Sequence, residues 1–283
     1  MLVLGAAGML GLALCHGLRA AGYTVDAFDR ARFDALRDPV ASLPIAGARS
    51  VINAVGLINR RIGRVPDADF WRVNALFPRQ LSDNCVQAGV PLLHISTDCV
   101  FSGTGAPHDE QAPPDAHDIY GASKAAGEPL QACVVRTSII GPEWERRDSL
   151  LCWVLSQTGA VDGYTHHRWN GVTTLELARV LALMLEEGVD RQAGVRHVHG
   201  EEITKHDLLV LIAQVMRHPL QVRAAAPGAA RDTRLSTLYP QDLARWQIRP
   251  LRRQLEDLAP LCGPQGQWLG DPPPDRNALS TTP

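Results

Sequence analysis

A tyrosine and a lysine stand four positions apart in the segment DIYGASKAAGEPL, at Tyr120 and Lys124. On a helix, residues at i and i+4 lie on one face, one turn from each other. A phenol titrates at about pH 10, and a neighbouring ammonium lowers its pKa because it favours the phenolate. The pair is either a tuned proton donor or a tyrosine above a surface lysine, since this spacing alone has low specificity. Motifs elsewhere in the sequence are needed to distinguish a proton donor from a surface pair.

Three glycines follow the first apolar run: LVLGAAGMLG places Gly5, Gly8 and Gly11 between a short strand-like segment and a helical one. A dinucleotide-binding loop needs a tight turn, close approach of a pyrophosphate to backbone N–H groups, and close helix–strand packing. The spacing is Gly-x-x-Gly-x-x-Gly rather than Gly-x-Gly-x-x-Gly, and a merely flexible turn is the alternative. The position of the loop at the start of a strand–helix–strand series favours dinucleotide binding.

An acid and a base follow the second strand-like run, TVDAFD. Asp29 ends it about 20 residues past the loop, where a carboxylate can hydrogen-bond the adenosine ribose. Arg30 comes next and could instead hold a 2′-phosphate. Asp29 favours NAD and Arg30 favours NADP, so both cofactors stay open. We expect Asp34 near the adenine, with a solvated loop acid as the alternative.

The elements that must position these residues alternate along the chain. Strand-like runs at 2–5, 24–29, 50–56, 91–97 and 133–141 are interleaved with helical stretches, among them 69–89 and 120–131. This alternation predicts an α/β fold with a parallel sheet and right-handed crossovers. A doubly wound sheet is favoured over a barrel, because the alternation becomes irregular after about residue 141.

The second half predicts a smaller C-terminal lobe. It holds helical stretches at 149–159, 170–188 (opened by Thr173 or Thr174), 204–218 (capped by Thr204) and 243–261 (broken by Pro250). We expect a dinucleotide-binding domain over 1–145, to which a strand and a helix from about 168–198 return. Residues 146–167 and 199–262 form the substrate lobe, and 263–283, rich in proline and glycine, form a disordered tail.

Composition excludes several classes of protein. A net charge of -2 and a pI of about 6.5 give no general affinity for nucleic acid or membranes. No apolar run approaches the roughly 20 residues of a membrane helix, and the N-terminus lacks the basic region of a signal peptide. Six scattered cysteines without a Cys-x-x-Cys pair predict reduced thiols in a cytoplasmic protein. His166 and His167 are adjacent without a suitable third ligand, so we predict no metal site.

Five segments together resemble a known superfamily. GAAGMLG, NAVG (53–56), HISTDCVFSG (94–103), YGASK (120–124) and RTSIIG (136–141) occur in the order and spacing of the extended short-chain dehydrogenase/reductases. More narrowly, ISTDCVFSG followed by YGASKAAGE resembles the dTDP-4-dehydrorhamnose reductase group, over about residues 1–240. The resemblance implies a Rossmann-like fold that uses NADPH or NADH to reduce the 4-keto group of a nucleotide-activated deoxysugar. The pathway implied is deoxysugar, capsule or lipopolysaccharide biosynthesis.

The resemblance also implies site residues. The catalytic set is Thr97, whose hydroxyl contacts the substrate oxygen, Tyr120, which donates a proton, and Lys124, which lowers the tyrosine's pKa and contacts the nicotinamide ribose. Tyr120 and Lys124 also count among the cofactor-binding residues, with Gly5, Gly8, Met9, Leu10, Gly11, Asp29, Arg30, Asp34, Asn53, Ala54 and Val55. The substrate-binding residues are Asn74 (alternatively a packing amide), Asp98, Ser138, Trp169, Arg231 and Arg234, the two arginines being candidates for the substrate diphosphate.

Departures from the group and rival functions stay open. Ile139 and Ile140 stand where many of these reductases have an aromatic residue, and the loop 56–71 is unusually basic, so the sugar is not fixed. The rivals are an epimerase of the same fold, less favourably a dehydratase, and a non-catalytic regulatory subunit similar to the methionine adenosyltransferase β subunit. A homodimer is the only protein partner that we expect.

Overall fold

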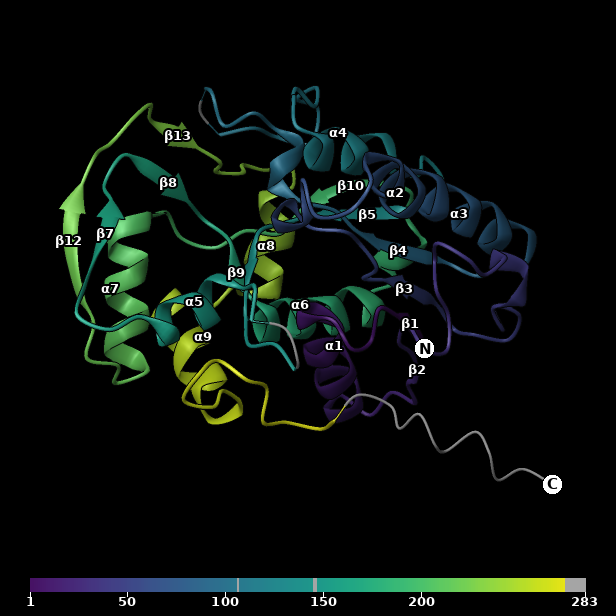
Figure 1. Cartoon of the computed structure of the whole chain (residues 1–283). Helices are drawn as coiled ribbons and strands as arrows, with labels where there is room; N and C mark the ends of the chain where they lie inside the picture. The colour runs from purple at the N-terminus through teal and green to yellow at the C-terminus, as the bar shows by residue number, and fades with distance from the viewer. Residues whose placement is uncertain (106, 145–146, 273–283) are drawn as a thin grey trace.

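The centre of the molecule is a parallel sheet of six strands in the order β10-β5-β4-β3-β1-β2 (Figure 1). The structure is a computed structural model in which residues 1–105, 107–144 and 147–272 are described. The strands are β1 (Leu2–Leu4), β2 (Asp26–Phe28), β3 (Val51–Asn53), β4 (Leu92–Ile95), β5 (Cys133–Arg136) and β10 (Gly194–His197). β1, β3, β4 and β5 are buried along their whole length, as expected of parallel strands covered on both faces.

The strand order reverses between β1 and β3. In register, Val3 lies between Ala27 of β2 and Ile52 of β3. The chain runs outward from β1 to β2 and then continues on the other side of β1, from β3 to β10. Open α/β sheets bind ligands at the carboxyl ends of the strands beside such a reversal. The glycine loop after β1 and the turn after β3 both lie at this point.

Helices cover both faces of the sheet (Figure 1). On one face α1 (Met9–Ala20) packs beside α6 (Thr174–Glu186), and their leucines share a core with alternate residues of the strands. The other face carries α2 (Asp67–Phe70), a π-helical turn η3 (Trp71–Leu76), α3 (Phe77–Gln87) and α4 (Ile119–Ala126). The expected doubly wound α/β fold is confirmed.

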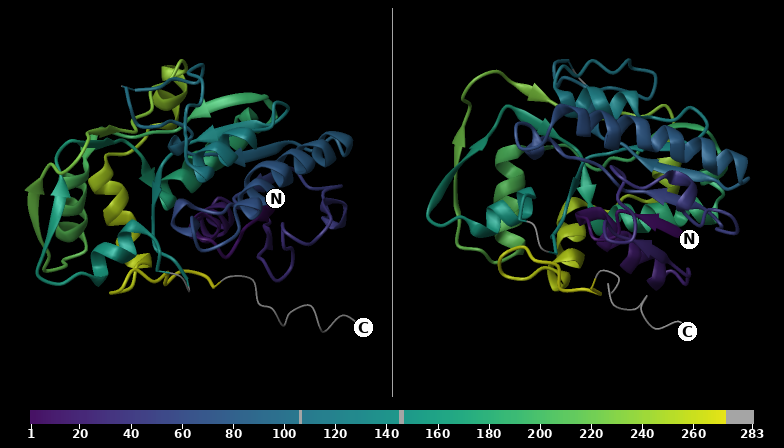
Figure 2. Two further views of the ribbon diagram at one scale, coloured as in Figure 1. Left: turned by 45° about the horizontal axis from the view of Figure 1, so that its top comes forward. Right: turned by 45° about the vertical axis from the view of Figure 1, so that its right-hand side comes forward.

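A smaller lobe lies at one side of the sheet in all views (Figures 1 and 2). In it β7 (Ala160–Tyr164) pairs with β12 (Gln221–Ala225), and β8 (His167–Trp169) lies between β11 (Ile203–Thr204) and β13 (Arg231–Asp232). α5 (Leu150–Ser156), α7 (Lys205–Val215) and α9 (Leu251–Leu258) enclose its core. The remaining elements are β6 (Ile139–Ile140), β9 (Val172–Thr173), α8 (Pro240–Trp246), and 3₁₀ turns η1 (Val40–Ser42), η2 (Asn59–Arg61), η4 (Asp98–Val100), η5 (Val189–Arg191) and η6 (Ala259–Leu261).

Several expected boundaries need correction. The helix expected over 120–131 ends at Ala126, because a Cβ at Gly127 would lie 1.8 Å from the Asn74 carbonyl oxygen and the chain turns there. The tail expected over 263–283 is partly folded. Trp268 is 2% exposed, and its backbone N–H donates to the Glu143 carbonyl (2.8 Å). Residues 273–283 lie outside the described part. No helix of the described residues is long and apolar enough to cross a membrane.

Candidate active site

The three glycines after β1 have different structural roles. Gly5 has φ +82°, and a Cβ there would lie 2.9 Å from the Ala54 backbone. A Cβ at Gly11 would lie 2.1 Å from the Gly5 carbonyl oxygen, so the fold requires glycine at both positions. Gly8 is exposed, and a Cβ there would meet only the Gly5 oxygen, at 3.2 Å. The fold alone hardly demands glycine at position 8, which points to approach by a ligand.

The loop leads into the N-terminus of α1. Gly8 is the N-cap and offers no side chain, and no acid stands in the first turn. The amides of Met9, Leu10 and Gly11 therefore belong to the turn whose N–H groups lack intrahelical acceptors. Such a turn favours anions through its N–H groups and the helix dipole. The predicted pyrophosphate site has the required backbone geometry.

The acids expected around the adenosine are engaged locally. Asp29, directly after β2, is 6% exposed, and its Oδ1 accepts the N–H groups of Ala31 (2.9 Å) and Arg32 (3.0 Å). Arg30 donates to Asp34 (3.1 Å), whose other oxygen accepts the Leu36 N–H (3.0 Å). Asp34 therefore organises this turn. Asp29 and the exposed Arg30 remain at the carboxyl edge of the sheet, where either can meet a ribose.

The turn after β3 is built on Asn53. This side chain is fully buried; its Nδ2 lies 3.1 Å from His94 Nδ1 and its Oδ1 accepts the Val55 N–H (3.0 Å). The amide thus shapes the turn and is not itself open to a cofactor. Ala54 and Val55 are half-buried, and Ala54 packs against Gly5, so their backbone forms the other wall of the glycine loop.

Thr97, Tyr120 and Lys124 come together at the carboxyl end of β4. Thr97 follows β4, and its Oγ1 accepts the Cys99 N–H (3.1 Å). Tyr120 lies in the first turn of α4, where the Asp118 carboxylate caps the helix by accepting the Gly121 N–H (2.9 Å). The groups around the phenol include Thr97, Asp98 and Cys99. Lys124, 5% exposed, donates from Nζ to the Ile95 carbonyl (2.7 Å), two residues before Thr97.

The proton equilibria differ from the sequence prediction. Burial raises the pKa of Tyr120 above its ordinary value, and the neighbouring Cys99 and Asp98 raise it further, while Thr97 opposes them. Burial lowers the pKa of Lys124 to about 8 against the opposing charge of Glu128. The expected lowering of the phenol's pKa by the lysine is therefore wrong, because the ammonium is desolvated and directed at a carbonyl. The phenol is therefore protonated at neutral pH, as a proton donor must be, although its raised pKa makes it a weaker acid than an unperturbed phenol.

A buried ion pair supports this end of β4. Arg136 of β5 and Glu128 form two hydrogen bonds of 2.8 and 2.7 Å, with side chains 4% and 10% exposed. Glu128 also accepts the Ser96 hydroxyl (2.6 Å), next to Thr97. Glu128, which follows α4, thus links the helix of Tyr120 to Ser96 at the end of β4 and to Arg136 at the end of β5.

Asp98, a predicted substrate residue, follows Thr97 in the turn after β4. Its carboxyl is 3% exposed and accepts the Thr97 hydroxyl (3.1 Å), and Ser138, Cys99 and Thr233 of the smaller lobe lie close enough to affect its pKa. Burial raises its pKa. Ser138, a predicted substrate residue, is half-buried beside it. Asp98 therefore joins the two lobes at the candidate site.

Three predicted substrate residues have other partners in this structure. The Asn74 amide is 1% exposed and fully hydrogen-bonded, to Leu57 (2.8 and 3.0 Å) and to Ser123 (3.1 Å), which makes it the packing amide. Trp169 is 8% exposed and belongs to the core of the smaller lobe. The Arg234 guanidinium is held by Asp232 and Glu202. Arg231, by contrast, is exposed beside the loop at Gly103.

Lys205 lies near the candidate site, and sequence reasoning did not single it out. It opens α7, and the charged groups around its ammonium include Asp98, Cys99, Arg60 and Arg231. A sequence signal existed: the chain has 28 lysines and arginines, and Lys124 and Lys205 are its only lysines. Because lysine is so rare in this chain, Lys205 could have been singled out from the sequence.

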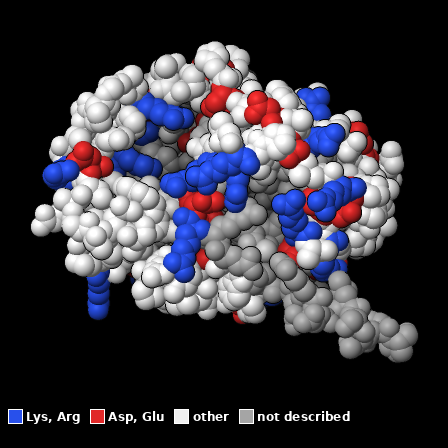
Figure 3. Space-filling view, viewed as in Figure 1, with Lys and Arg blue, Asp and Glu red and all other residues white. Residues whose placement is uncertain are grey.

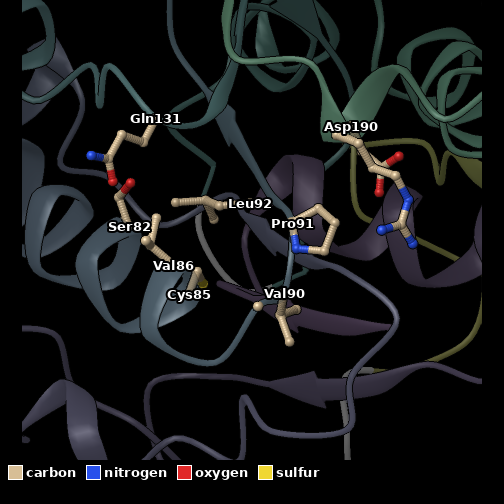
Figure 4. Close-up of a pocket in the computed structure, with 10 residues that line it drawn as sticks. Ser82, Cys85, Val86, Val90, Pro91, Leu92, Gln131 and Asp190 are labelled. Atoms are coloured by element: carbon tan, nitrogen blue, oxygen red, sulfur yellow. The ribbon is translucent and has the colours of Figure 1, made fainter.

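Two cavities lie away from these residues. One of about 240 Å³ is bounded by α3, the turn before β4 and η5, with Ser82, Cys85 and Gln131 in its wall (Figure 4). It lies at the amino ends of β4, β5 and β10, opposite Thr97. A second of about 420 Å³ lies between His199 and α8. Among the described residues no cluster of three or more histidine, cysteine or acidic side chains could hold a metal ion.

Comparison with known proteins gives consistent matches. A family model described as RmlD substrate binding domain matches residues 1–262. A dTDP-4-dehydrorhamnose reductase of Mycobacterium tuberculosis is 26% identical over 281 residues, covering 92% of this chain and 91% of the relative. The solved structure of a dTDP-4-dehydrorhamnose reductase from Clostridium acetobutylicum covers 92% of this chain and 98% of its own, with a TM-score of 0.76 at 20% identity. That from Bacillus anthracis, in complex with NADP, covers 91% and 97%, with a TM-score of 0.75 at 19% identity.

Proposed function

The chain belongs to the RmlD substrate binding domain family, and from this premise we propose that it is an NAD(P)H-dependent reductase of a nucleotide-activated 4-keto sugar in deoxysugar biosynthesis. The observation that carries the proposal is the convergence of Thr97, Tyr120 and Lys124 at the carboxyl end of β4, next to the glycine loop. Several relatives are named dTDP-4-dehydrorhamnose reductases, which makes that sugar the first candidate substrate.

The residues act as follows. The nicotinamide, when bound, supplies hydride to the carbonyl carbon. The Thr97 hydroxyl donates to Asp98 (3.1 Å) in this structure and turns to the carbonyl oxygen when substrate binds, and the half-buried Tyr120, whose raised pKa keeps it protonated, gives that oxygen its proton. Lys124 holds the Ile95 carbonyl and presents positive charge toward the nicotinamide ribose. A positioned acid of this kind contributes typically 10²–10⁴-fold to rate.

The cofactor is held by backbone more than by side chains. Met9, Leu10 and Gly11 offer the N–H groups of α1 to the pyrophosphate, and Gly8 allows it to approach. Asp29 or Arg30 contacts the adenosine ribose. We place the reaction in the cytoplasm, where the six free thiols stay reduced.

The test is a titration of the purified protein with NADPH and NADH, followed by nicotinamide fluorescence. A panel of 4-keto nucleotide sugars, beginning with dTDP-4-dehydrorhamnose, is then added. Loss of the nicotinamide signal with one sugar supports the proposal and identifies cofactor and substrate. Binding without oxidation across the panel overturns it and favours an epimerase or a regulatory subunit, and absence of binding contradicts the glycine-loop assignment as well.

A further inference from the structure

The choice of basic residue sets Lys205 apart. Of the 28 lysines and arginines, only Lys124 and Lys205 are lysines, and one of them is already part of the candidate catalytic set. Arginine keeps its proton at all physiological pH values, whereas lysine is a compact point charge that can lose it when buried. Lys205 is half-buried at the start of α7, whose N-cap is Thr204.

Backbone pairing brings this lysine toward the catalytic turn. β11, which leads directly into Lys205, pairs with β8, and β8 pairs with β13. β13 is in turn joined to the first lobe, because the Asp232 N–H donates to the Gly103 carbonyl (2.9 Å). Thr233, the next residue, is a partner of Asp98. The small sheet β11-β8-β13 therefore docks on the loop that follows Thr97.

The charges at this junction are unbalanced. The titratable and charged groups that face Lys205 are Asp98 and Cys99 from the turn after β4, Arg60 from η2 and Arg231 from β13, and His167 of β8 lies close by. Lys205 thus has two further cations, Arg60 and Arg231, near it, and the Asp98 carboxyl that faces it is buried.

The neighbouring arginines show the contrast. Arg61 is paired with Asp148 (3.3 Å), and Arg234 with Asp232 (2.6 Å). Within the part of the chain that the structure describes, Lys205, Arg60 and Arg231 have no ion-pair partner within 4.0 Å. Lysine and arginine side chains gather over the middle of this face, between the lobes (Figure 3).

We propose that Lys205 is a further substrate-binding residue, which joins Arg60 and Arg231 in holding an anionic group of the nucleotide sugar beside the Thr97–Cys99 turn. The inference rests on the proposed function, since it assigns a part of that substrate. The anion is either a phosphate of the diphosphate or a carboxylate on an acidic sugar, since an ammonium and two guanidiniums bind both.

The binding has a predictable pH dependence. Burial lowers the pKa of Lys205 to about 8, with Asp98 opposing and the two arginines reinforcing the shift. Anion binding requires the ammonium, so affinity falls as the pH rises through about 8. In a Lys205→Arg variant the charge persists, and this fall disappears.

Amine modification tests the proposal without any turnover. The chain offers three amines: the N-terminus, Lys124 and Lys205. An amine-selective reagent is applied at pH 8, and the modification rate at each site is read by mass spectrometry. We expect dTDP or a nucleotide sugar to slow modification of Lys205 by roughly tenfold or more. We expect NADPH to slow Lys124 instead.

The arms of this experiment separate the two anions. Equal protection of Lys205 by dTDP, UDP-glucose and UDP-glucuronic acid identifies the diphosphate, whereas protection by UDP-glucuronic acid alone identifies a sugar carboxylate. An unchanged Lys205 rate with all three, in protein whose Lys124 is protected by NADPH, overturns the inference. Protection of Lys205 in a protein that reduces no sugar would leave the inference standing while the proposed reductase falls.

Kinetics of variants provide the second readout. Lys205→Met is expected to raise KM for the sugar about tenfold or more, with kcat changed less than about threefold, as for an interaction made equally in ground and transition states. Arg223→Met, an exposed arginine of the same lobe, is the matched control and should behave as wild type. A wild-type KM in Lys205→Met, at every pH from 7 to 9, would also refute the role.

Discussion

At the scale of single residues, the chemistry depends on whether Tyr120 keeps its phenol proton at neutral pH. Burial and the neighbouring Cys99 and Asp98 raise the pKa of the phenol, so it is protonated throughout the neutral range. Lys124 acts differently from a lysine that only lowers a phenol's pKa: it holds the Ile95 carbonyl and fixes the end of β4. Reduction of a carbonyl needs a proton donor, and the protonated phenol of Tyr120 is that donor.

Replacement of Tyr120 by phenylalanine removes the donor and keeps the ring. We expect kcat to fall by at least about 10²-fold, because the ring that remains has no proton to give to the substrate oxygen. The affinity for NADPH should change less than about twofold. Tyr164→Phe, on an exposed strand of the smaller lobe, is the matched control. Wild-type turnover in Tyr120→Phe would contradict the mechanism.

Whether a site residue could be predicted from the sequence depends on how far along the chain its contact partners lie. Thr97, Tyr120 and Lys124 stand in short motifs whose spacing survives folding. The contacts of Asn74 could not be predicted in this way, because its partner Ser123 lies 49 residues away and nothing in the local sequence shows that the amide is already hydrogen-bonded. Arg234 differs, because one of its partners, Asp232, lies two residues away and the other, Glu202, 32 residues away.

At the scale of elements, the glycine loop separates a structural requirement from a functional one. Gly11 is required by the packing of α1 on the loop, whereas a Cβ at the exposed Gly8 would meet only the Gly5 oxygen, at 3.2 Å. Gly8→Val should therefore weaken NADPH binding by about tenfold or more and lower the melting temperature less than Gly11→Ala does. Gly11→Ala should lower the melting temperature markedly, since its Cβ would overlap backbone. Fluorescence titration and thermal melts decide, and unchanged affinity in Gly8→Val would refute the loop's assignment.

Elements with a strong period were predicted, and short ones were not. The apolar runs that became β1, β3, β4 and β5, and the caps at Thr173 and Thr204, follow from local sequence. β11 and β13 have two residues each, too few for any alternation to show. The helix expected over 69–89 contains a π-helical turn, where the Asn74 amide holds Leu57 and the Asn74 carbonyl meets Gly127. Such contacts come from tertiary packing.

At the scale of the whole molecule, the titration of the buried groups decides how stability depends on pH. Burial raises the pKa of all six free thiols, to about 12 for Cys85 and Cys133. The six are Cys15, Cys85, Cys99, Cys133, Cys152 and Cys262. Above about pH 8.5 the unfolded chain loses thiol protons that the folded chain keeps. Their stabilising contribution is therefore complete below that pH and declines as the pH rises toward the folded-state values.

Two lysines act in the opposite direction. The folded-state pKa is about 8 for Lys124 and for Lys205, against about 10.4 in an unfolded chain. Between these values the unfolded chain binds more protons, so this term makes stability rise with pH. Six thiols outnumber two ammoniums, and Tyr120 adds to the decline above about pH 10. The net free energy of unfolding should therefore fall in alkaline solution.

We expect the melting temperature to drop by on the order of 5 °C between pH 8 and pH 9.5, in the presence of a thiol reductant that excludes oxidation. The variant Cys85→Ala/Cys133→Ala removes two of the titrating thiols, both 1% exposed, and should show a shallower decline from its own starting value. A flat or rising melting temperature in the wild type would mean that the thiols titrate alike in the folded and unfolded chain. An equal slope in the double variant would place the titration elsewhere, because burial of these two side chains is what separates the folded from the unfolded pKa.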